Sequence, residues 1–417
     1  MSEWPVYRGE GVPVRERIES LPEPPRWRRF DGEPLDDVYE VPPLDSASSR
    51  RLGDRPPLPV QEQRAIDLIN AALFLRRPLL VTGDPGAGKS TLAHALAHEL
   101  DLGRVLQWPI VSRTELRSGL YEYDAIGRLQ DAQAQPALSA GTGAIAGAGG
   151  AGGTGGTGAI AGAGGTGGAS GPSGAADTAD TAYATSHPHA TDPTDPTDPT
   201  HPADPTDPTA STDPTHPTHP TPEPSVAHYV RLGPLGTALL PLKRPRVLLI
   251  DELDKSDIDL PNDLLNVMEE GEFVIPALER IADRAGQRTV RVLTDDGRRV
   301  PVTGGRVRCH AFPVIVMTSN GEREFPAPLM RRCIHLHLDP PRGQRLAAMV
   351  QAHFGDGADA EHQDLVEMFT SDRGGAPRPT DQLLNAIYLT QRVAPPGSPR
   401  RAELARLLMG SFDAGPR

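Results

Sequence analysis

The sequence has few cysteines, few aromatic residues and no long apolar run. Its 417 residues include two cysteines, Cys309 and Cys333, and 4% aromatic side chains. The cysteines lack metal-ligand spacing and lie in strand-like contexts, which is typical of buried, reduced thiols. No stretch approaches the roughly 18 consecutive apolar residues of a membrane span, and the first residues lack the basic-then-apolar form of a signal peptide. We therefore expect a soluble cytoplasmic protein without a membrane segment.

One long segment also lacks positive charge. Residues 131–225 contain no Lys or Arg but carry nine Asp and Glu223, so they supply −10 of the formal net charge of −13. Ten residues at 141–150 recur at 156–165, and Asp-Pro-Thr and His-Pro-Thr triplets fill 191–222. Such sequences cannot bury enough apolar surface to offset the entropy of ordering them. We expect a long disordered insertion, with a flexible first half and a stiffer, extended second half.

The stretch at residues 78–91 joins an apolar strand to a helix through a glycine-rich turn. Gly83, Gly88, Lys89 and Ser90 satisfy the phosphate-loop pattern G-x-x-x-x-G-K-[ST]. Glycines let successive backbone N–H groups face phosphate oxygens, and the N terminus of the following helix favours the same anion. Lys89 is expected to reach the β- and γ-phosphates, and the Ser90 hydroxyl to bind Mg²⁺. A turn that merely joins strand to helix is the alternative. The predicted nucleotide-binding set is Gly83, Asp84, Pro85, Gly86, Ala87, Gly88, Lys89, Ser90 and Thr91.

Two later apolar runs end in polar residues. The first ends in Asp251 and Glu252, and the second ends in a polar triplet whose last residue is Asn320. Continuous apolar runs are typical of parallel strands covered on both faces, and ligands in such sheets bind at the carboxyl ends of the strands. We expect Asp251 to hold Mg²⁺ through a water molecule bound to the ion, and Glu252 to align the attacking water. Asn320 is expected to lie near the γ-phosphate. Residues that only form the next turns are the alternative reading.

The remaining pattern predicts further elements of both kinds. Apolar residues at helical spacing predict helices at 60–73, 89–100, 261–270, 326–332, 342–354, 359–371, 379–393 and 399–412. A buried strand is predicted at 105–111, and a hairpin at 289–302 around Asp-Asp-Gly. A strand with alternating faces is predicted at 333–338, with His335 and His337 as packed or edge residues. Ser112 and Glu115 form a capping-box pattern that predicts a short helix after them. The Pro-rich residues 1–57 predict an arm that lies over a neighbouring surface or is partly disordered.

With these residues assembled, the chain resembles an AAA+ ATPase, and more narrowly the MoxR-type branch of the helix-2-insert group. The resemblance covers about 58–130 and 226–412. It implies a P-loop NTPase αβα sandwich with a central parallel sheet, plus a C-terminal α-helical lid. The domains would be an N-terminal arm at 1–57, a nucleotide-binding core in two pieces at 58–130 and 226–340, an insertion at 131–225 and a lid at 341–417.

The resemblance also implies residue roles. It makes the loop at 83–90 the Walker A motif, Asp251 and Glu252 Walker B, and Asn320 sensor 1. Arg378 matches sensor 2. Either Arg331 or Arg332 matches the arginine finger, and register favours Arg332. The hairpin matches the one that precedes sensor 1, and residues 233–238 resemble the Gly-Pro loop that is linked to substrate or partner contact.

The function implied by the resemblance is hydrolysis of ATP with Mg²⁺ in a homo-oligomeric ring, a hexamer by family resemblance. An arginine from one subunit would complete its neighbour's site, and turnover would remodel or activate a protein client. An alternative is a nucleic-acid motor or restriction-type NTPase on the same fold. The folded part, however, lacks a Lys/Arg-rich block with interleaved aromatics. A small-molecule kinase is a third reading, but it leaves Asn320, the paired arginines and the C-terminal helices unexplained.

Overall fold

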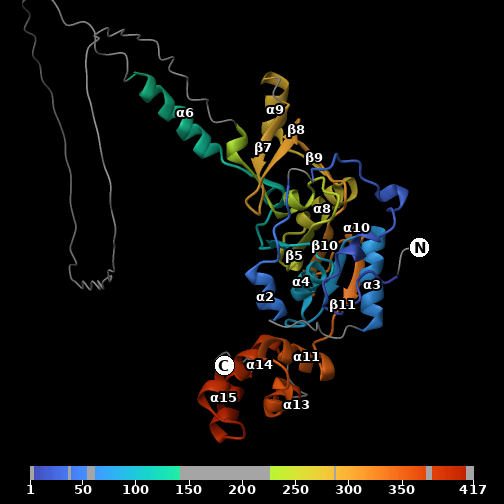
Figure 1. Cartoon of the computed structure of the whole chain (residues 1–417). Helices are drawn as coiled ribbons and strands as arrows, with labels where there is room; N and C mark the ends of the chain where they lie inside the picture. The colour runs from blue at the N-terminus through green and yellow to red at the C-terminus, as the bar shows by residue number, and fades with distance from the viewer. Residues whose placement is uncertain are drawn as a thin grey trace, which may run out of the picture. The chain divides into compact units, whose positions relative to one another are not determined.

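The computed structural model describes residues 4–35, 39–53, 62–140, 226–285, 288–371 and 378–409. Its centre is a sheet of five parallel strands in the order β11-β1-β10-β5-β2 (Figure 1). The strands are β1 (Leu79–Thr82), β2 (Leu106–Pro109), β5 (Val247–Asp251), β10 (Val314–Ser319) and β11 (Ile334–His337). All five lie in segments where the apolar pattern predicts strands. The predicted α/β class with a central parallel sheet is therefore confirmed.

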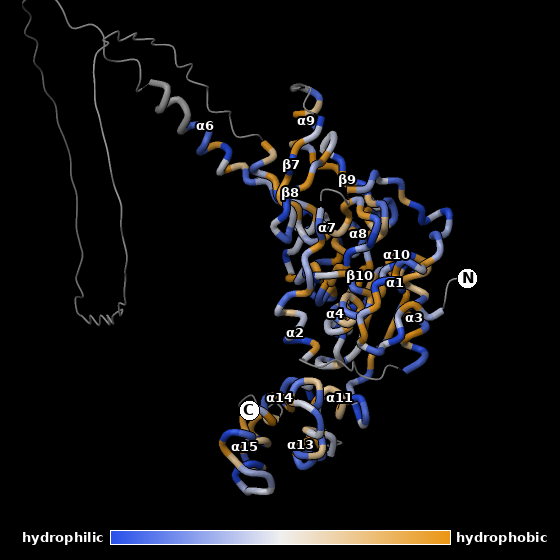
Figure 2. Tube along the Cα trace, viewed as in Figure 1, coloured by the Kyte–Doolittle hydropathy of each residue, from blue (hydrophilic) through white to orange (hydrophobic). Residues whose placement is uncertain are grey.

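Each face of this sheet is buried beneath its own hydrophobic cluster. Successive residues of a strand point to opposite faces, so Leu79 joins one cluster and Leu80 the other. Figure 2 shows the hydrophobic residues concentrated around β10. Burial on both faces explains why the three central strands, β1, β5 and β10, are continuous apolar runs. The first cluster includes α3 (Gln63–Leu75) and α4 (Lys89–Glu99), and the second includes α7 (Pro234–Ala238), α8 (Asp259–Glu270) and α10 (Ala327–Arg332).

The chain also forms a second sheet of six strands, in the order β3-β4-β7-β8-β9-β6. The strands are β3 (Tyr121–Tyr123), β4 (Val230–Leu232), β6 (Glu272–Val274), β7 (Thr289–Leu293), β8 (Arg299–Thr303) and β9 (Arg306–Arg308). Antiparallel β7 and β8 confirm the predicted hairpin, whose turn contains Gly297 at a φ of +81°. The other four strands have three residues each and are absent from the sequence prediction, as is α9 (Pro276–Ala285).

Two predictions near residue 120 need correction. Helix α5 (Leu116–Leu120) has Glu115 at its N-cap and no side-chain cap, so Ser112 and Glu115 do not form a capping box. The helix starts later because Val111 N–H is taken up by the Thr114 hydroxyl in a turn, at 2.9 Å. Helix α6 (Ala125–Ala140) continues past residue 131, where the insertion was expected to begin. Residues 131–140 are therefore helical, and the rest of the predicted insertion, 141–225, lies outside the described residues.

The C-terminal helices bury a hydrophobic cluster of their own, which includes Leu346, Leu383 and Ala405. The helix predicted at 359–371 is divided at His362, whose ring is buried and hydrogen-bonded to Gln391 and Arg401 at 2.7 and 2.8 Å. The other three helices are present as predicted, and residues 410–412 of the last one lie outside the described residues. The helices are α11 (Gly343–Phe354), α12 (Ala358–Glu361), α13 (Gln363–Ser371), α14 (Thr380–Val393) and α15 (Pro399–Met409).

The described part of the N-terminal arm lies over the core, as the first of the two predictions for it expects. The Asn70 amide oxygen accepts the N–H groups of Val6 and Tyr7 at 2.8 and 2.9 Å. The fully buried Glu99 carboxylate accepts further arm N–H groups, including that of Arg8 at 2.6 Å. Farther along, the arm forms α1 (Arg15–Glu19), the 3₁₀ turn η1 (Arg26–Arg28) and α2 (Ser46–Leu52). An ordered arm is thus observed for residues 4–35 and 39–53.

Two expectations drawn from composition can also be compared with the structure. Cys309 and Cys333 are both buried and unpaired, as predicted. Burial raises the pKa of each thiol to about 12, so both stay protonated and unreactive at neutral pH. Within the described ranges, every helix is too short or too polar to cross a lipid bilayer.

Candidate nucleotide site

The glycine-rich loop connects β1 to α4 and has the backbone shape that its glycines allow. Gly86 and Gly88 have φ values of +80° and +88°, in the left-handed region that other residues rarely adopt. A Cβ at Gly86 would lie 2.7 Å from the Pro379 Cα atom, so a side chain has no room there. Gly88 is the N-cap of α4, an eleven-residue helix whose first N–H groups can bind an anion.

Lys89 and Ser90, the first two residues of α4, both have polar partners in the site. The Lys89 ammonium donates to the carbonyls of Gly83 and Asp84, at 2.7 and 2.9 Å. Burial lowers the pKa of Lys89, while nearby carboxylates, first among them Asp254, oppose that shift. The loop carbonyls hold the charged group where a phosphate could replace them as its partner.

Ser90 and Asp251 are the pair expected to hold a metal ion. The Ser90 hydroxyl donates to the Asp251 carboxylate at 2.6 Å, and the Thr318 hydroxyl donates to the same oxygen at 2.7 Å. Hydroxyl and carboxylate oxygens are ligands that Mg²⁺ prefers, with water and substrate phosphates completing its shell. Within the described residues, no group of three His, Cys, Asp or Glu side chains converges on a metal position. A metal here would therefore depend on few protein ligands.

Glu252 and Asn320 follow two neighbouring strands of the sheet. Glu252 has a φ of +62°, an uncommon conformation for a residue with a side chain, and its N–H donates to the Thr318 hydroxyl at 2.8 Å. Its carboxylate pairs with Lys255, which lies in the 3₁₀ turn η3 (Leu253–Lys255), at 2.7 Å. The Asn320 N–H donates to the buried Asp254 carboxylate at 2.9 Å. These bonds fix the backbone that carries the Glu252 and Asn320 side chains.

These elements surround one cavity of about 290 Å³. It brings together most of the predicted nucleotide and metal residues with Glu252 and Asn320. Three further lining residues, Arg51, Thr318 and Thr380, are absent from the sequence prediction. The lining residues are Arg51, Pro85, Gly86, Gly88, Lys89, Ser90, Thr91, Asp251, Glu252, Thr318, Asn320 and Thr380.

A second cavity of about 240 Å³ adjoins the first and shares the loop with it. Its lining includes the apolar side chains of Leu338, Pro341 and Met349. The Thr380 hydroxyl donates to the Gly86 carbonyl at 3.0 Å, and Arg345 donates to the Ala87 carbonyl at 3.0 Å. The C-terminal helices therefore contact the loop directly, and the apolar wall suits a flat aromatic ring.

The three predicted arginines lie outside both cavities. Arg332, at the end of α10, forms an ion pair with Glu269. The Arg331 side chain is exposed, and within the described ranges no hydrogen bond or ion pair reaches its guanidinium. Arg378 donates to the Met368 carbonyl at 3.4 Å. Two residues later, Thr380 is the first residue of α14 and the one that contacts the loop.

The Gly-Pro segment expected to contact a partner is buried as helix α7. Leu235 and Thr237 are fully buried, and a Cβ on Gly236 would lie 1.9 Å from the Leu120 carbonyl oxygen. The Thr237 hydroxyl accepts the N–H of Asp295, in the hairpin turn, at 2.9 Å. In this conformation the segment connects the core to the hairpin, and within it only Pro234 is partly exposed.

Helix α2 of the arm is attached to α4 by a buried hydrogen bond. The Asp45 carboxylate caps α2 by accepting the Ser48 N–H at 3.0 Å, and the Ser48 hydroxyl lies 2.9 Å from His94 Nδ1. His94 is fully buried. Burial lowers its pKa from 6.5 to about 4, and the positive charge of Arg51 adds to the shift. The imidazole is therefore neutral at physiological pH.

His94 should make the stability of the fold depend on pH. Below about pH 6.5 the unfolded chain binds a proton that the folded chain excludes until about pH 4, so this contribution is complete above pH 6.5 and falls on acidification. We expect a loss of about 3 kcal/mol over that interval. Denaturant unfolding at several pH values measures it. His94→Asn, which cannot titrate, should lack this part of the slope, and equal slopes would contradict the prediction.

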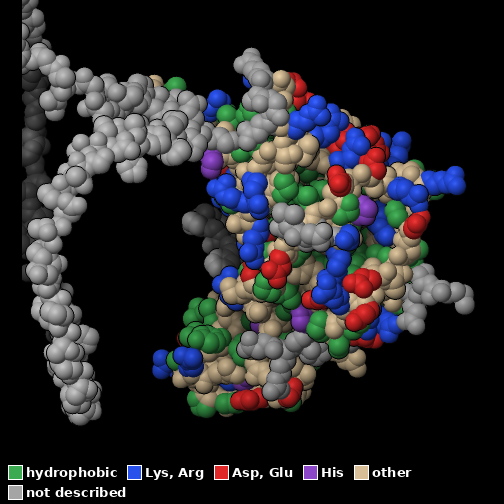
Figure 3. Space-filling view, turned by 45° about the horizontal axis from the view of Figure 1, so that its top comes forward, with side chains coloured by type: hydrophobic (Ala, Val, Ile, Leu, Met, Phe, Trp, Pro, Cys, Tyr) green, Lys and Arg blue, Asp and Glu red, His purple; other side chains and the backbone are tan. Residues whose placement is uncertain are grey.

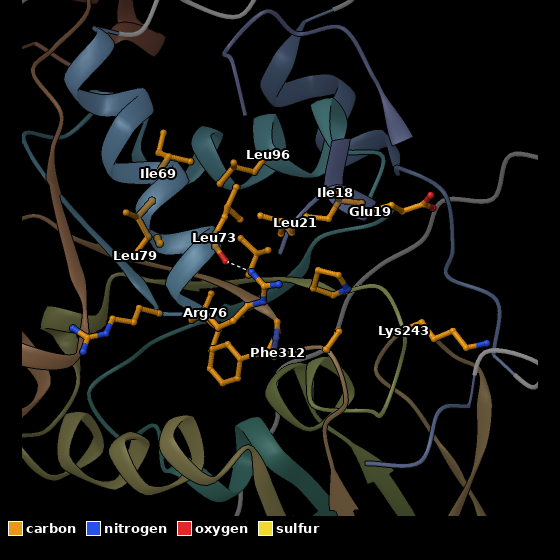
Figure 4. Close-up of a pocket in the computed structure, with 17 residues that line it drawn as sticks. Ile18, Glu19, Leu21, Ile69, Leu73, Arg76, Leu79, Leu96, Lys243 and Phe312 are labelled. Atoms are coloured by element: carbon orange, nitrogen blue, oxygen red, sulfur yellow. Dashed lines mark hydrogen bonds between the residues drawn. The ribbon is translucent and has the colours of Figure 1, made fainter. Parts of the chain in front are cut away.

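A further cavity, of about 200 Å³, lies at the other end of the sheet. Figure 4 shows that Ile18, Ile69, Leu73 and Leu96 line it, and that the Arg76 guanidinium turns toward the Leu73 carbonyl. Its lining holds a single carboxylate, that of Glu19, and no hydroxyl side chain. We assign it no function.

Comparisons with protein-family models and with curated proteins find no match to this chain.

Proposed function

We propose that this chain binds ATP with Mg²⁺ in the two adjoining cavities and hydrolyses the γ-phosphate. The observation that carries the proposal is the 2.6 Å contact of the Ser90 hydroxyl with Asp251, beside the loop that holds Lys89. When bound, Mg²⁺ would neutralise charge on the phosphates. Lys89 would exchange its carbonyl partners for phosphate oxygens, Glu252 would accept the proton of the attacking water, and Asn320 would orient that water.

The proposal extends to the surroundings of the site. The apolar cavity would take the base, and contacts of Thr380 and Arg345 with the loop would let the C-terminal helices act as a lid that responds to the nucleotide. We propose a ring in which Arg331 reaches a neighbouring subunit, since Arg332 would first have to leave Glu269. Hydrolysis would then remodel or activate a protein client.

A nucleic-acid motor is less well supported. On the face shown in Figure 3, acidic and basic side chains are interspersed over the described part of the chain. A backbone-tracking protein instead concentrates Lys and Arg along one groove.

Release of phosphate from ATP tests the proposal. The wild-type chain should release phosphate only when Mg²⁺ is present. Lys89→Ala removes the two charge-assisted contacts that the ammonium would make with phosphate oxygens. It should weaken nucleotide binding at least about 100-fold. Lys243→Ala, a lysine outside both cavities, is the matched control and should bind as the wild type does. A wild-type chain that neither binds ATP nor releases phosphate would overturn the proposal.

A further inference from the structure

The N-terminal arm reaches the nucleotide cavities through Arg51, a residue outside every nucleotide motif of the sequence. Arg51 occupies the last turn of α2 and lines both the polar cavity and the apolar one. Few residues do so, and among the others are Gly86, Gly88 and Thr91 of the loop and α4. Arg51 therefore lies where the two cavities meet, between the places proposed for the phosphates and for the base.

Helix α2 is held in this position from two sides. Besides the buried contact of Ser48 with His94, the buried Leu52 packs against Ala95 of α4. On the other side, Gly53 approaches α11 so closely that a Cβ would lie 2.4 Å from the Ala352 carbonyl oxygen. Gly53 has a φ of +85°, which also favours glycine. The arm thus carries Arg51 on a helix that contacts α4, and the residue after this helix contacts α11.

Arg51 differs from other arginines that contact or belong to the arm. Several of those have carboxylate partners: Arg17 pairs with Glu99, Arg29 with Glu23, and Arg104 with Asp45. Arg51, by contrast, has an exposed side chain, and no described residue forms an ion pair or a hydrogen bond with its guanidinium. A planar guanidinium at the rim of a phosphate cavity can bind two oxygens of one phosphate at once.

We propose that Arg51 is a nucleotide-binding residue that contacts the phosphate nearest the base. The inference rests on the proposed function and adds the arm to the site, so each subunit supplies this cation to its own nucleotide. Since α2 lies against both α4 and α11, a nucleotide held by Arg51 would also hold the arm between the core and the C-terminal helices.

The test compares ligands with and without phosphates on the full-length chain. Arg51→Ala should weaken ADP binding about 10-fold or more, the effect of losing a charge-assisted contact, and leave adenosine binding unchanged. Arg51→Lys should recover part of the loss, because it keeps the charge but not the two-oxygen contact. Arg50→Ala is the matched control: Arg50 is the preceding arginine of the same helix and lines only the apolar cavity, so it should not discriminate between the two ligands.

Two results would overturn the inference. If Arg51→Ala bound ADP like the wild type, the guanidinium would not touch the phosphates. If it lost ADP and adenosine equally, Arg51 would only support the packing of α2. Unchanged denaturant unfolding of Arg51→Ala is expected, because the side chain is exposed and unpaired within the described ranges. A wild-type chain that fails to bind ADP would instead count against the proposed function itself.

Discussion

Replacement of Glu252 by glutamine is expected to slow ATP hydrolysis by about 10²–10⁴-fold while ATP still binds. Glutamine has nearly the shape of glutamate but cannot accept a proton from water. The Glu252 backbone is fixed by its bond to Thr318, so the substitution should not move the side chain out of the cavity. The carboxylate must leave Lys255 to reach a water molecule, but both partners are more than 40% exposed. Such a surface pair contributes little free energy, so this step is not a barrier to turnover.

Single-turnover phosphate release and retention of labelled ATP measure the two effects separately. Glu322→Gln is the control, because Glu322 is a nearby acid that lies outside the cavity lining. It should leave turnover unchanged. Hydrolysis by Glu252→Gln at the wild-type rate would exclude Glu252 as the base. Loss of ATP binding in the same variant would show that Glu252 holds the nucleotide and not the water.

Long buried elements of this fold are visible in the sequence, and short ones are not. Strands β1, β5 and β10 are continuous apolar runs because helices cover both of their faces. The second sheet gives no such signal, since four of its strands have three residues, too few to show an alternating period. The hairpin of β7 and β8 is the exception, because its strands are longer and Asp-Asp-Gly marks the turn between them.

The candidate site divides in the same way. The residues of the loop are neighbours in the sequence, and so are Asp251 and Glu252 at the end of β5. Asn320 directly follows β10, so local sequence patterns are enough to predict all of these residues. Thr318 could have been recognised as the first residue of the polar triplet that ends in Asn320. Arg51 and Thr380 come from elements far away in the sequence, and only the packing of α2 and α14 on the loop brings them to the cavity. Their roles depend on tertiary contacts that no local pattern encodes.

A buried ion pair connects three parts of the chain at the start of β5, the end of that strand opposite to Asp251. Arg246 and Asp296 have fully buried side chains, 2.8 Å apart. The Tyr39 hydroxyl of the arm bonds to both, and the Thr294 hydroxyl donates to Asp296 at 2.6 Å. Arg246 precedes β5, while Thr294 and Asp296 belong to the hairpin turn. A movement of the hairpin would therefore carry the start of β5 and the arm with it, or break this pair.

Burial has opposite outcomes for the two adjacent aspartates of the hairpin turn. It raises the pKa of Asp296, but hydrogen bonds from Thr294, Tyr39 and Arg246, together with the charge of Arg246, outweigh it and hold the pKa below its usual value. For Asp295, burial dominates and raises the pKa. The charge on Asp296 therefore stabilises the fold above about pH 4, and this contribution is lost as pH falls through its lowered pKa. The charge on Asp295 opposes folding at neutral pH.

Asp296→Asn is accordingly expected to lower the free energy of unfolding at pH 7 by about 3 kcal/mol or more, because it leaves the Arg246 charge buried without a partner. Asp295→Asn removes a charge whose burial is unfavourable, so it should leave stability unchanged or increase it. Denaturant unfolding of both variants makes the comparison, with equal slopes required for a valid difference. Equal losses in the two variants would mean that the turn responds to any substitution. Only a loss confined to Asp296 would identify the ion pair as the connection between the hairpin, β5 and the arm.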